Sequence, residues 1–217
     1  MMPTPHSADN QKFSNQAHQT ARSVIYPELF KNLSNGDELE FENTTIQDGE
    51  RGSVLDGEMA TDRIVLIRSR LFATQPKAYR HLEPPGRRIA FTVQERFREP
   101  EFLPHQDLTI TVWNPNSNQP SELFKLMAQW FLYGYYDKNT NTHLHAVLVN
   151  INDMMMGIVN GYLPFKDGMN PRTKQPFIAI KFNDLRTHNI MRAEWRNNCL
   201  EWCFFKKAAI PFVQKVA

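Results

Sequence analysis

Apolar residues follow two different periods along this chain and divide it into short elements. Alternation over residues 38–46 predicts a half-buried strand, and the apolar run that closes residues 60–67 predicts a central strand buried on both faces. Similar β-branched and alternating patterns predict four more strands. These strands cover residues 88–97, 108–113, 143–149 and 177–182.

Helical periodicity occurs in four further segments. It predicts helices over residues 16–33, 120–136, 153–160 and 190–207. The dipeptide Pro120-Ser121 is typical of a helix start and opens the second of them. That helix is expected to carry an apolar stripe on one face and a polar stripe that includes Gln129 and Tyr133.

The order of these elements favours an α/β fold with a mixed central sheet. A helix comes first, followed by short strands in sequence, a second helix and a further strand. Sequential short strands favour an antiparallel meander, and a strand after a helix favours a parallel crossover. We expect a disordered tail over residues 1–15 and a core domain over residues 16–160. Residues 161–217 are expected to add a strand and a helix that pack on this core.

The composition excludes several classes of protein. Hydrophobic residues make up 41% of the 217 residues, which excludes a mainly disordered chain. The 2 cysteines cannot form a disulfide framework, and the 9 glycines disfavour a nucleotide-cofactor fold. No apolar run reaches the ~18 residues of a membrane span, and the N-terminus lacks the apolar core of a secretory signal. We therefore expect a cytoplasmic protein with no membrane partner.

Three polar side chains are predicted to converge on two neighbouring strands. Asp62 stands at the head of one strand, and Gln94 and Arg96 are two residues apart on the next, so they share a face. Carboxylate and amide oxygens are ligands that Mg²⁺ prefers, and a fixed cation stabilises developing negative charge. If the two strands pair, this set suits hydrolysis of a phosphodiester.

These residues resemble the signature of the PD-(D/E)XK nuclease superfamily, the restriction-endonuclease-like proteins. That signature is an acidic residue on one strand and an acid-x-Lys triplet on the next, here Asp62 and Gln94-Glu95-Arg96, in a helix, three-strand, helix, strand core. The segment Gln129-Trp-Phe-Leu-Tyr133 is similar to the Gln-x-x-x-Tyr motif of RecB-like branches, in which both residues face the active site and the DNA. The resemblance covers roughly residues 16–153.

The resemblance implies a metal-dependent DNA endonuclease with an αβββαβ core, encoded by a phage or a mobile element. It implies Mg²⁺ or Mn²⁺ as cofactor, with Asp62 and Gln94 as metal ligands and Arg96 stabilising the phosphate. Glu28 would be the additional carboxylate that many members place on the first helix. Double-stranded DNA is the expected partner, and a homodimer is the expected assembly.

The chain departs from the family pattern at two positions. Gln94 brings an oxygen ligand without charge, so metal affinity should be lower, and Arg96 cannot act as a general base because a guanidinium has no acceptor for a proton. The site is then either a tolerated variant or a degenerate one, in which case the protein is a catalytically inactive module that binds DNA or protein. A slipped register would use Glu95 as the acid, although strand alternation places the Glu95 side chain on the other face of the strand from Gln94. An unrelated α/β interaction protein is a further alternative.

Other clusters change this picture less. The net charge of +2 does not indicate a class of binding partner. Basic residues nevertheless gather around the two strands, where they would contact DNA phosphates or form an ordinary solvated surface. The candidate DNA-binding residues are Arg63, Arg68, Arg70, Arg87, Arg88, Arg98 and Lys125. His143 and His145 are predicted to share a strand face and, without a clear third ligand, to be hydrogen-bonded rather than metal-bound. Cys199 and Cys203 are expected to be reduced thiols on a helix.

Overall fold

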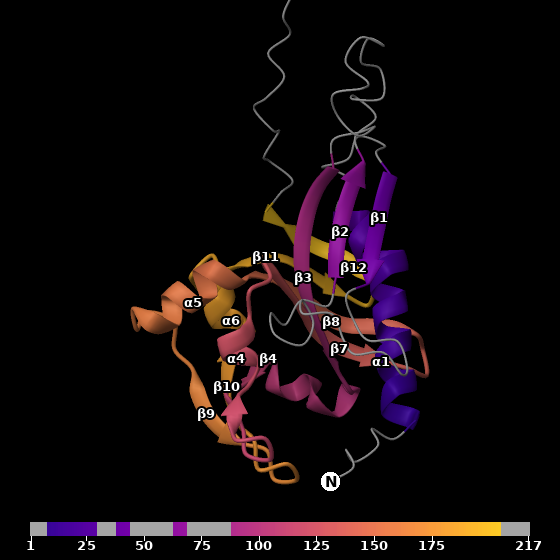
Figure 1. Cartoon of the computed structure of the whole chain (residues 1–217). Coiled ribbons are helices and arrows are strands. Elements are labelled where there is room, and N and C mark those ends of the chain that lie inside the picture. Colours follow the sequence, from indigo (N-terminus) through magenta and orange to yellow (C-terminus); the bar gives the residue numbers. More distant parts are fainter. Residues whose placement is uncertain (1–7, 30–37, 44–62, 69–87, 205–217) are drawn as a thin grey trace, which may run out of the picture.

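The computed structural model describes residues 8–29, 38–43, 63–68 and 88–204, with side chains placed in residues 12–29 and 91–204. It is a mixed α/β fold built on a large sheet of seven strands in the order β1-β2-β3-β7-β8-β11-β12 (Figure 1). Only the β3–β7 pair is parallel; the other pairs of this sheet are antiparallel. The strands are β1 Glu38–Asn43, β2 Arg63–Arg68, β3 Arg88–Arg98, β7 Trp130–Asp137, β8 Thr142–Asn150, β11 Met191–Arg196 and β12 Cys199–Cys203.

A smaller antiparallel sheet has the strand order β4-β10-β9 and lies against one face of the large one. Its strands are β4 Asp107–Thr111, β10 Pro176–Lys181 and β9 Lys166–Met169. A two-strand ribbon, β5 Trp113–Asn114 with β6 Gln119–Pro120, follows β4. The strand predicted at residues 108–113 therefore exists, but it belongs to this small sheet and not to the central one.

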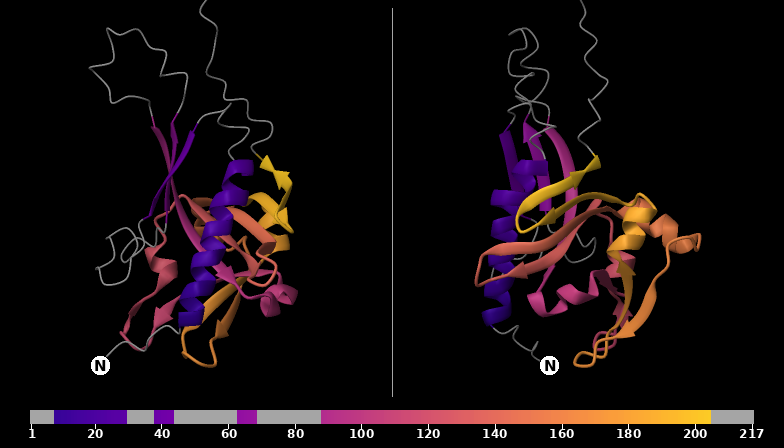
Figure 2. Two further views of the ribbon diagram at one scale, coloured as in Figure 1. Left: turned by 90° about the vertical axis from the view of Figure 1, so that its right-hand side faces the viewer. Right: turned by 180° about the vertical axis from the view of Figure 1, so that it is seen from behind.

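The helices divide between the two faces of the large sheet (Figure 2). On one face lies α1 Ala8–Thr20, which continues through the π-helical turn η1 Ala21–Ile25 and stays helical to residue 29. The short helices on the side of the small sheet are η4 Pro100–His105, α4 Glu122–Lys125, α5 Ile151–Val159 and α6 Phe182–Thr187.

Each face of the large sheet has its own apolar core. Ile25 and Leu29 of the N-terminal helix pack with Trp195 on one face. Ile110 and Ile180 of the small sheet pack with residues of β7, β8, α5 and α6 on the other. The large sheet is thus buried on both sides, which is why its central strands are almost continuously apolar.

The helix predicted over residues 120–136 is wrong. Only residues 122–125 are helical, and Trp130–Asp137 forms strand β7 beside β3. Every residue from Phe131 to Tyr136 is buried, and successive side chains enter opposite cores, so the two-residue period of a strand prevails over the helical period. Aromatic residues, which fill this segment, also favour strands.

The helix predicted over residues 190–207 is also wrong, because residues 191–203 form the β11–β12 hairpin. Its two-residue loop is Asn197-Asn198, with φ of 50° and 64°, the left-handed geometry that an Asn pair tolerates in a tight hairpin. Two boundaries also differ from the prediction. The first helix begins at Ala8, inside the segment predicted as a disordered tail, and β10 and β11 of the predicted extension are hydrogen-bonded members of the two sheets.

Candidate functional site

Strand β3 presents two different polar surfaces, one on each side of the large sheet. Glu95 points to the N-terminal helix, where it accepts hydrogen bonds from Tyr26 and His18. Arg96 points the other way and contacts β4 and α4. Because side chains alternate along a strand, Gln94 shares the face of Arg96. The predicted placing of Gln94 with Arg96 on one face is confirmed, and Glu95, the acid of the slipped register, lies on the opposite face.

Arg96 links β3 to the two elements that cover it. Its Nη1 donates a 3.1 Å hydrogen bond to the backbone oxygen of Thr109 and lies 2.8 Å from Oε2 of Glu122. Glu122 is the first residue of α4, and its side chain is 8% exposed. Burial raises the pKa of the Glu122 carboxyl, while the charge of Arg96 and the neighbouring Thr111 act in the opposite direction. We call Gln94, Arg96 and Glu122 the β3 site.

Gln94 is buried in the β3 site with an unsatisfied acceptor. The residue is 9% exposed, and no described residue donates a hydrogen bond to its Oε1. Glu122 is better compensated, because its carboxyl group forms the ion pair with Arg96 and hydrogen bonds with the backbone and side chain of Thr111. Buried acceptors without donors are rare, and they mark a place where a ligand, an ion or a water fits.

The polar contacts continue along the same face toward the small sheet. Arg98 stacks over the ring of Phe102 at 3.8 Å and lies 3.8 Å from Asp107 Oδ1. The Tyr133 hydroxyl lies 3.0 Å from Thr109 Oγ1 and 3.5 Å from Nη1 of Arg98. The predicted site residue Tyr133 therefore does lie near Arg96 and Arg98, although it is on a strand and fully buried.

Gln129 and Glu28 lie elsewhere. Gln129 is exposed just before β7, where its backbone N–H donates to Thr92, so the predicted helix face that would join it to Tyr133 does not exist. Glu28 lies on the opposite side of the large sheet and accepts a 3.1 Å hydrogen bond from the backbone N–H of Leu200. The structure therefore separates Glu28 from Gln94 and Arg96.

Asp62, Arg70 and Arg87 lie outside the described residues. Of the other candidate DNA-binding residues, Arg63 pairs with Val93 at the start of β2, and Arg68 pairs with Arg88 at its end. The pairing of β2 with β3 that the sequence interpretation required is confirmed. Lys125, the last residue of α4, is half-buried.

Two histidine clusters lie on opposite faces of β8. The prediction that His143 and His145 share a face is wrong, because a register shift between Tyr135 and Tyr136 turns His143 to the other side. His143 packs against Phe97 and Tyr136, with ring centroids 4.6 and 4.9 Å away. Burial lowers the pKa of His143 to about 4.

His145 belongs to a second buried cluster around Glu194. Its Nε2 lies 2.8 Å from Oε1 of Glu194, which also pairs with Arg186 and Arg196. The hydrogen bond from His145 and then the Arg186 contact lower the pKa of Glu194 to about 2, against the effect of burial. All four residues have partners in the fold, so this cluster joins β8, α6 and β11. The predicted hydrogen bonding of His145 is confirmed, but the sequence pattern did not indicate Glu194 as its partner.

Comparisons with protein-family models, curated proteins and solved structures found no match for this chain. No group of three or more His, Cys, Asp or Glu side chains that could hold a metal ion lies within the described residues. In the same part of the chain, no helix is long and apolar enough to cross a membrane. Neither Cys199 nor Cys203 forms a disulfide bond within the described residues, and both lie on β12 instead of the predicted helix.

Proposed function

We propose that this protein is a metal-dependent DNA endonuclease of the PD-(D/E)XK type, with its active site at the β3 site. The observation that carries the proposal is the buried Oε1 of Gln94, without a donor among the described residues, on the same strand face as the guanidinium of Arg96. The order of elements supports it: a helix precedes the antiparallel β1-β2-β3 meander, and β7 follows parallel to β3 after the short α4. Phosphodiester hydrolysis needs an oxygen-ligated cation and a fixed positive charge together.

The donor set fits Mg²⁺ or Mn²⁺, both of which prefer oxygen ligands. Gln94 Oε1 would be one ligand and Asp62 the other. Asp62 directly precedes Arg63 in the chain, and Arg63 pairs with Val93, the neighbour of Gln94. The bound cation would polarise the phosphate and lower the pKa of a water molecule.

Arg96 would stabilise the negative charge that develops on the phosphate. A guanidinium has N–H donors and no acceptor, so Arg96 cannot accept the proton of the attacking water. Its side chain is 31% exposed, which leaves part of the group accessible from solvent. Arg98 lies on the same face of β3 and is suited to contact the DNA backbone.

Nicking of supercoiled plasmid DNA tests this proposal. We expect the purified protein to convert supercoiled plasmid to open circles with Mg²⁺ or Mn²⁺ and not with EDTA. Asp62→Ala should reduce the rate at least about 100-fold, the order expected when a catalytic metal ligand or charge stabiliser is lost. Asp167→Ala, which removes an exposed carboxylate on β9, is the matched control and should leave the rate unchanged. Wild-type protein that binds DNA but never nicks it would contradict the endonuclease proposal.

One observation favours a second candidate, a catalytically inactive nuclease-fold module that binds DNA. Arg96 already has two partners inside the fold, Thr109 and Glu122, which would fit a purely structural role. Such a module would bind DNA with an affinity that falls steeply with salt, because phosphate contacts release counterions. Salt-sensitive binding without nicking in either metal would select this candidate.

A further inference from the structure

We propose that the outer edge of β9 binds an extended segment of another protein, which adds a fourth strand to the small sheet. The segment that fits carries a basic residue between two apolar residues, at alternate positions. This inference is independent of the proposed nuclease function, because β10 separates β9 from β4 and from the β3 site. It rests on the backbone groups of β9 that point outward and on the side chains beside them.

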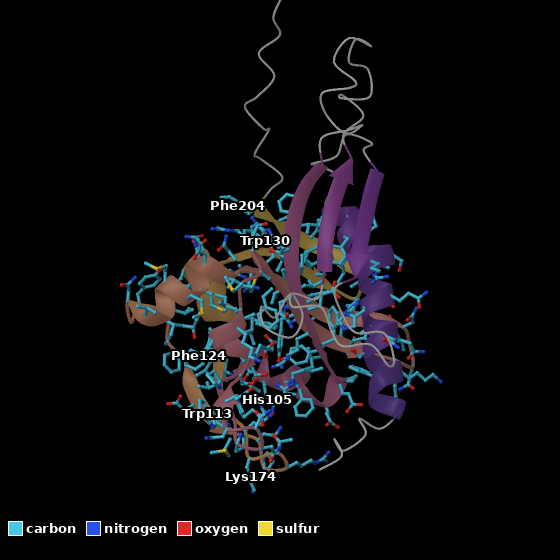
Figure 3. The ribbon with its side chains drawn as sticks, in the orientation of Figure 1. His105, Trp113, Phe124, Trp130, Lys174 and Phe204 are labelled. Carbon is cyan, nitrogen blue, oxygen red and sulfur yellow. The ribbon has the colours of Figure 1, made fainter. Side chains whose placement is uncertain are left out.

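The hydrogen bonds of the β9–β10 pair show which backbone groups of β9 point outward. Asn170 donates its N–H to the Gln175 carbonyl at 2.9 Å, at the loop end of the pair. Because hydrogen-bonded positions alternate along an antiparallel pair, the N–H and C=O groups of Asp167 and Met169 point away from β10. No described residue forms a backbone hydrogen bond with these groups. The hairpin lies at one end of the molecule, with Lys174 in its loop (Figure 3).

The other edge of the small sheet is covered by side chains. The Tyr135 hydroxyl accepts the N–H of Asp107 at 3.0 Å and donates to the carbonyl of the same residue at 2.8 Å. Nη1 of Arg96 donates to the Thr109 carbonyl at 3.1 Å. An uncovered edge strand pairs readily with another strand, and folded proteins usually protect such edges. Within the described residues β4 is protected in this way and β9 is not, so a strand can be added at β9.

Exposed apolar side chains gather near the β9 edge. The chain runs from α5 down to β9 along the outer side of the molecule (Figure 1). Five of the nine exposed large hydrophobic residues in the described part of the chain lie in this stretch, with exposed fractions from 42% to 76%. They are Met156, Val159, Tyr162, Phe165 and Met169. Exposed apolar surface of this kind is typical of protein–protein interaction sites.

The side chains of β9 define the chemistry of the partner. Asp167 lies directly opposite the core residue Ile178, so its side chain and that of Met169 share the face that packs toward the large sheet. Asp167 is exposed and forms no ion pair within the described residues. A strand added beside β9 places one side chain opposite Asp167 and others opposite Phe165 and Met169. A Lys or Arg flanked by apolar residues at alternate positions complements this row.

A second copy of this chain fits the β9 edge less well. If two β9 strands pair about a two-fold axis with Phe165 opposite Met169, Asp167 lies opposite the Asp167 of the other copy. Like charges directly opposite one another destabilise a strand pair. The acidic centre of β9 therefore favours a different partner, one with a basic residue at the middle of its strand.

Fluorescence anisotropy with the labelled peptide Thr-Val-Thr-Lys-Thr-Val-Thr tests this proposal. The peptide pattern reads the same in both directions, so it fits a parallel or an antiparallel ladder. We expect saturable binding to the wild type, and binding at least about 3-fold weaker when Glu replaces the Lys of the peptide. Asp167→Lys should reverse this preference. Lys166→Ala, a change at the adjacent position on the other face of β9, is the control and should bind like the wild type.

A second variant tests the backbone contacts. Asp167→Pro removes an outward N–H without removing a bond to β10, and it should weaken peptide binding at least about 10-fold because a peptide carbonyl loses its donor. Hydrogen exchange locates the contact, since the N–H groups of Asp167 and Met169 should gain protection when the peptide binds. Circular dichroism checks that the variant folds. If Asp167→Pro does not fold, the preference of Asp167→Lys and the exchange of the wild type decide.

Three results would overturn the proposal. The first is the absence of saturable binding up to about 1 mM peptide. The second is binding that neither Asp167→Lys nor Asp167→Pro changes, because the peptide then binds elsewhere. The third is dimerisation of the wild type that Asp167→Pro abolishes, because the β9 edge then belongs to a second copy of this chain.

Discussion

At the scale of single residues, His143 is the clearest case of a polar group held in an unfavourable environment. It is fully buried, and a hydrogen bond with the backbone of Ala17 offsets only part of the effect of burial on its pKa. The titratable groups that face it are Glu95 from β3 and His18 from α1, and both have a weaker effect on its pKa than burial does. Its aromatic neighbours Phe97 and Tyr136 favour the neutral ring.

This environment predicts a pH-dependent stability that depends on one residue. The pKa of His143 is about 4 in the folded protein, and the ordinary value, which applies to the unfolded chain, is 6.5. Between these two pH values the unfolded chain therefore binds more protons than the folded one. Stability should then rise with pH through this window and be lost as the pH falls, by about 3 kcal/mol in total. His143→Phe keeps a ring between Phe97 and Tyr136 and removes the titration.

Urea unfolding from pH 7 to pH 4 checks this prediction. The free energy of unfolding should fall by several kcal/mol for the wild type, and this fall should be smaller by about 3 kcal/mol for His143→Phe. The control His105→Gln changes an exposed histidine and should follow the wild type. Parallel pH curves for the wild type and His143→Phe would show that His143 is not neutral in the fold.

The residues of the β3 site differ in how far the sequence could reveal them. Gln94 and Arg96 follow from a strand and its two-residue period, which local pattern predicts well. Glu122 could not be found in this way, because its contact with Arg96 depends on how the chain returns after β4. Local periodicity carries no information on which distant elements meet, and the incorrect helix over residues 120–136 hid the contact further.

At the scale of elements, β7 shows why an apolar segment can be misassigned. Its buried residues fill two cores, Phe131, Tyr133 and Tyr135 on one side and Leu132 on the other. A segment buried on both faces loses the polar alternation that identifies a strand, and the remaining pattern also fits a helix. The strands at residues 38–43 and 142–150 were predictable because alternation or β-branched residues marked them.

Gly134 in the middle of β7 allows β8 to approach closely. A methyl group at this position would lie 2.7 Å from the backbone oxygen of His145 and 2.9 Å from Cβ of Ala146. Because a backbone atom cannot rotate away, Gly134→Ala should destabilise the fold by about 1–3 kcal/mol through overpacking. The measurement is the urea midpoint with an unchanged slope.

Gly161 provides the comparison for this prediction. It has φ of 73°, and no atom of the described residues lies within 4 Å of the point that a Cβ would occupy, so its constraint is the backbone angle alone. Gly161→Asn, a residue that tolerates the left-handed region, should cost less than Gly134→Ala. A Gly134→Ala protein as stable as the wild type would show that β7 and β8 can move apart at no cost.

At the scale of the whole molecule, the large sheet is shared by two cores. The N-terminal helix covers one face and the small sheet with its helices covers the other, so the strands β7, β8 and β11 contribute to both (Figure 2). The first and last described elements of the chain, α1 and the β11–β12 hairpin, both belong to this arrangement. Loss of either core would expose a face of the same strands.

This arrangement predicts that both cores unfold together. Ile25 and Ile180 are fully buried, one in each core, and Ile25→Ala or Ile180→Ala should each cost about 2–5 kcal/mol. Because the strands between the cores are common to both, each variant should shift one single thermal transition, seen equally by far-UV circular dichroism and tryptophan fluorescence. Val159→Ala, at a position 76% exposed, should leave that transition in place. Two separate transitions, with Ile25→Ala moving only one of them, would mean that the N-terminal helix and its core unfold independently of the small sheet.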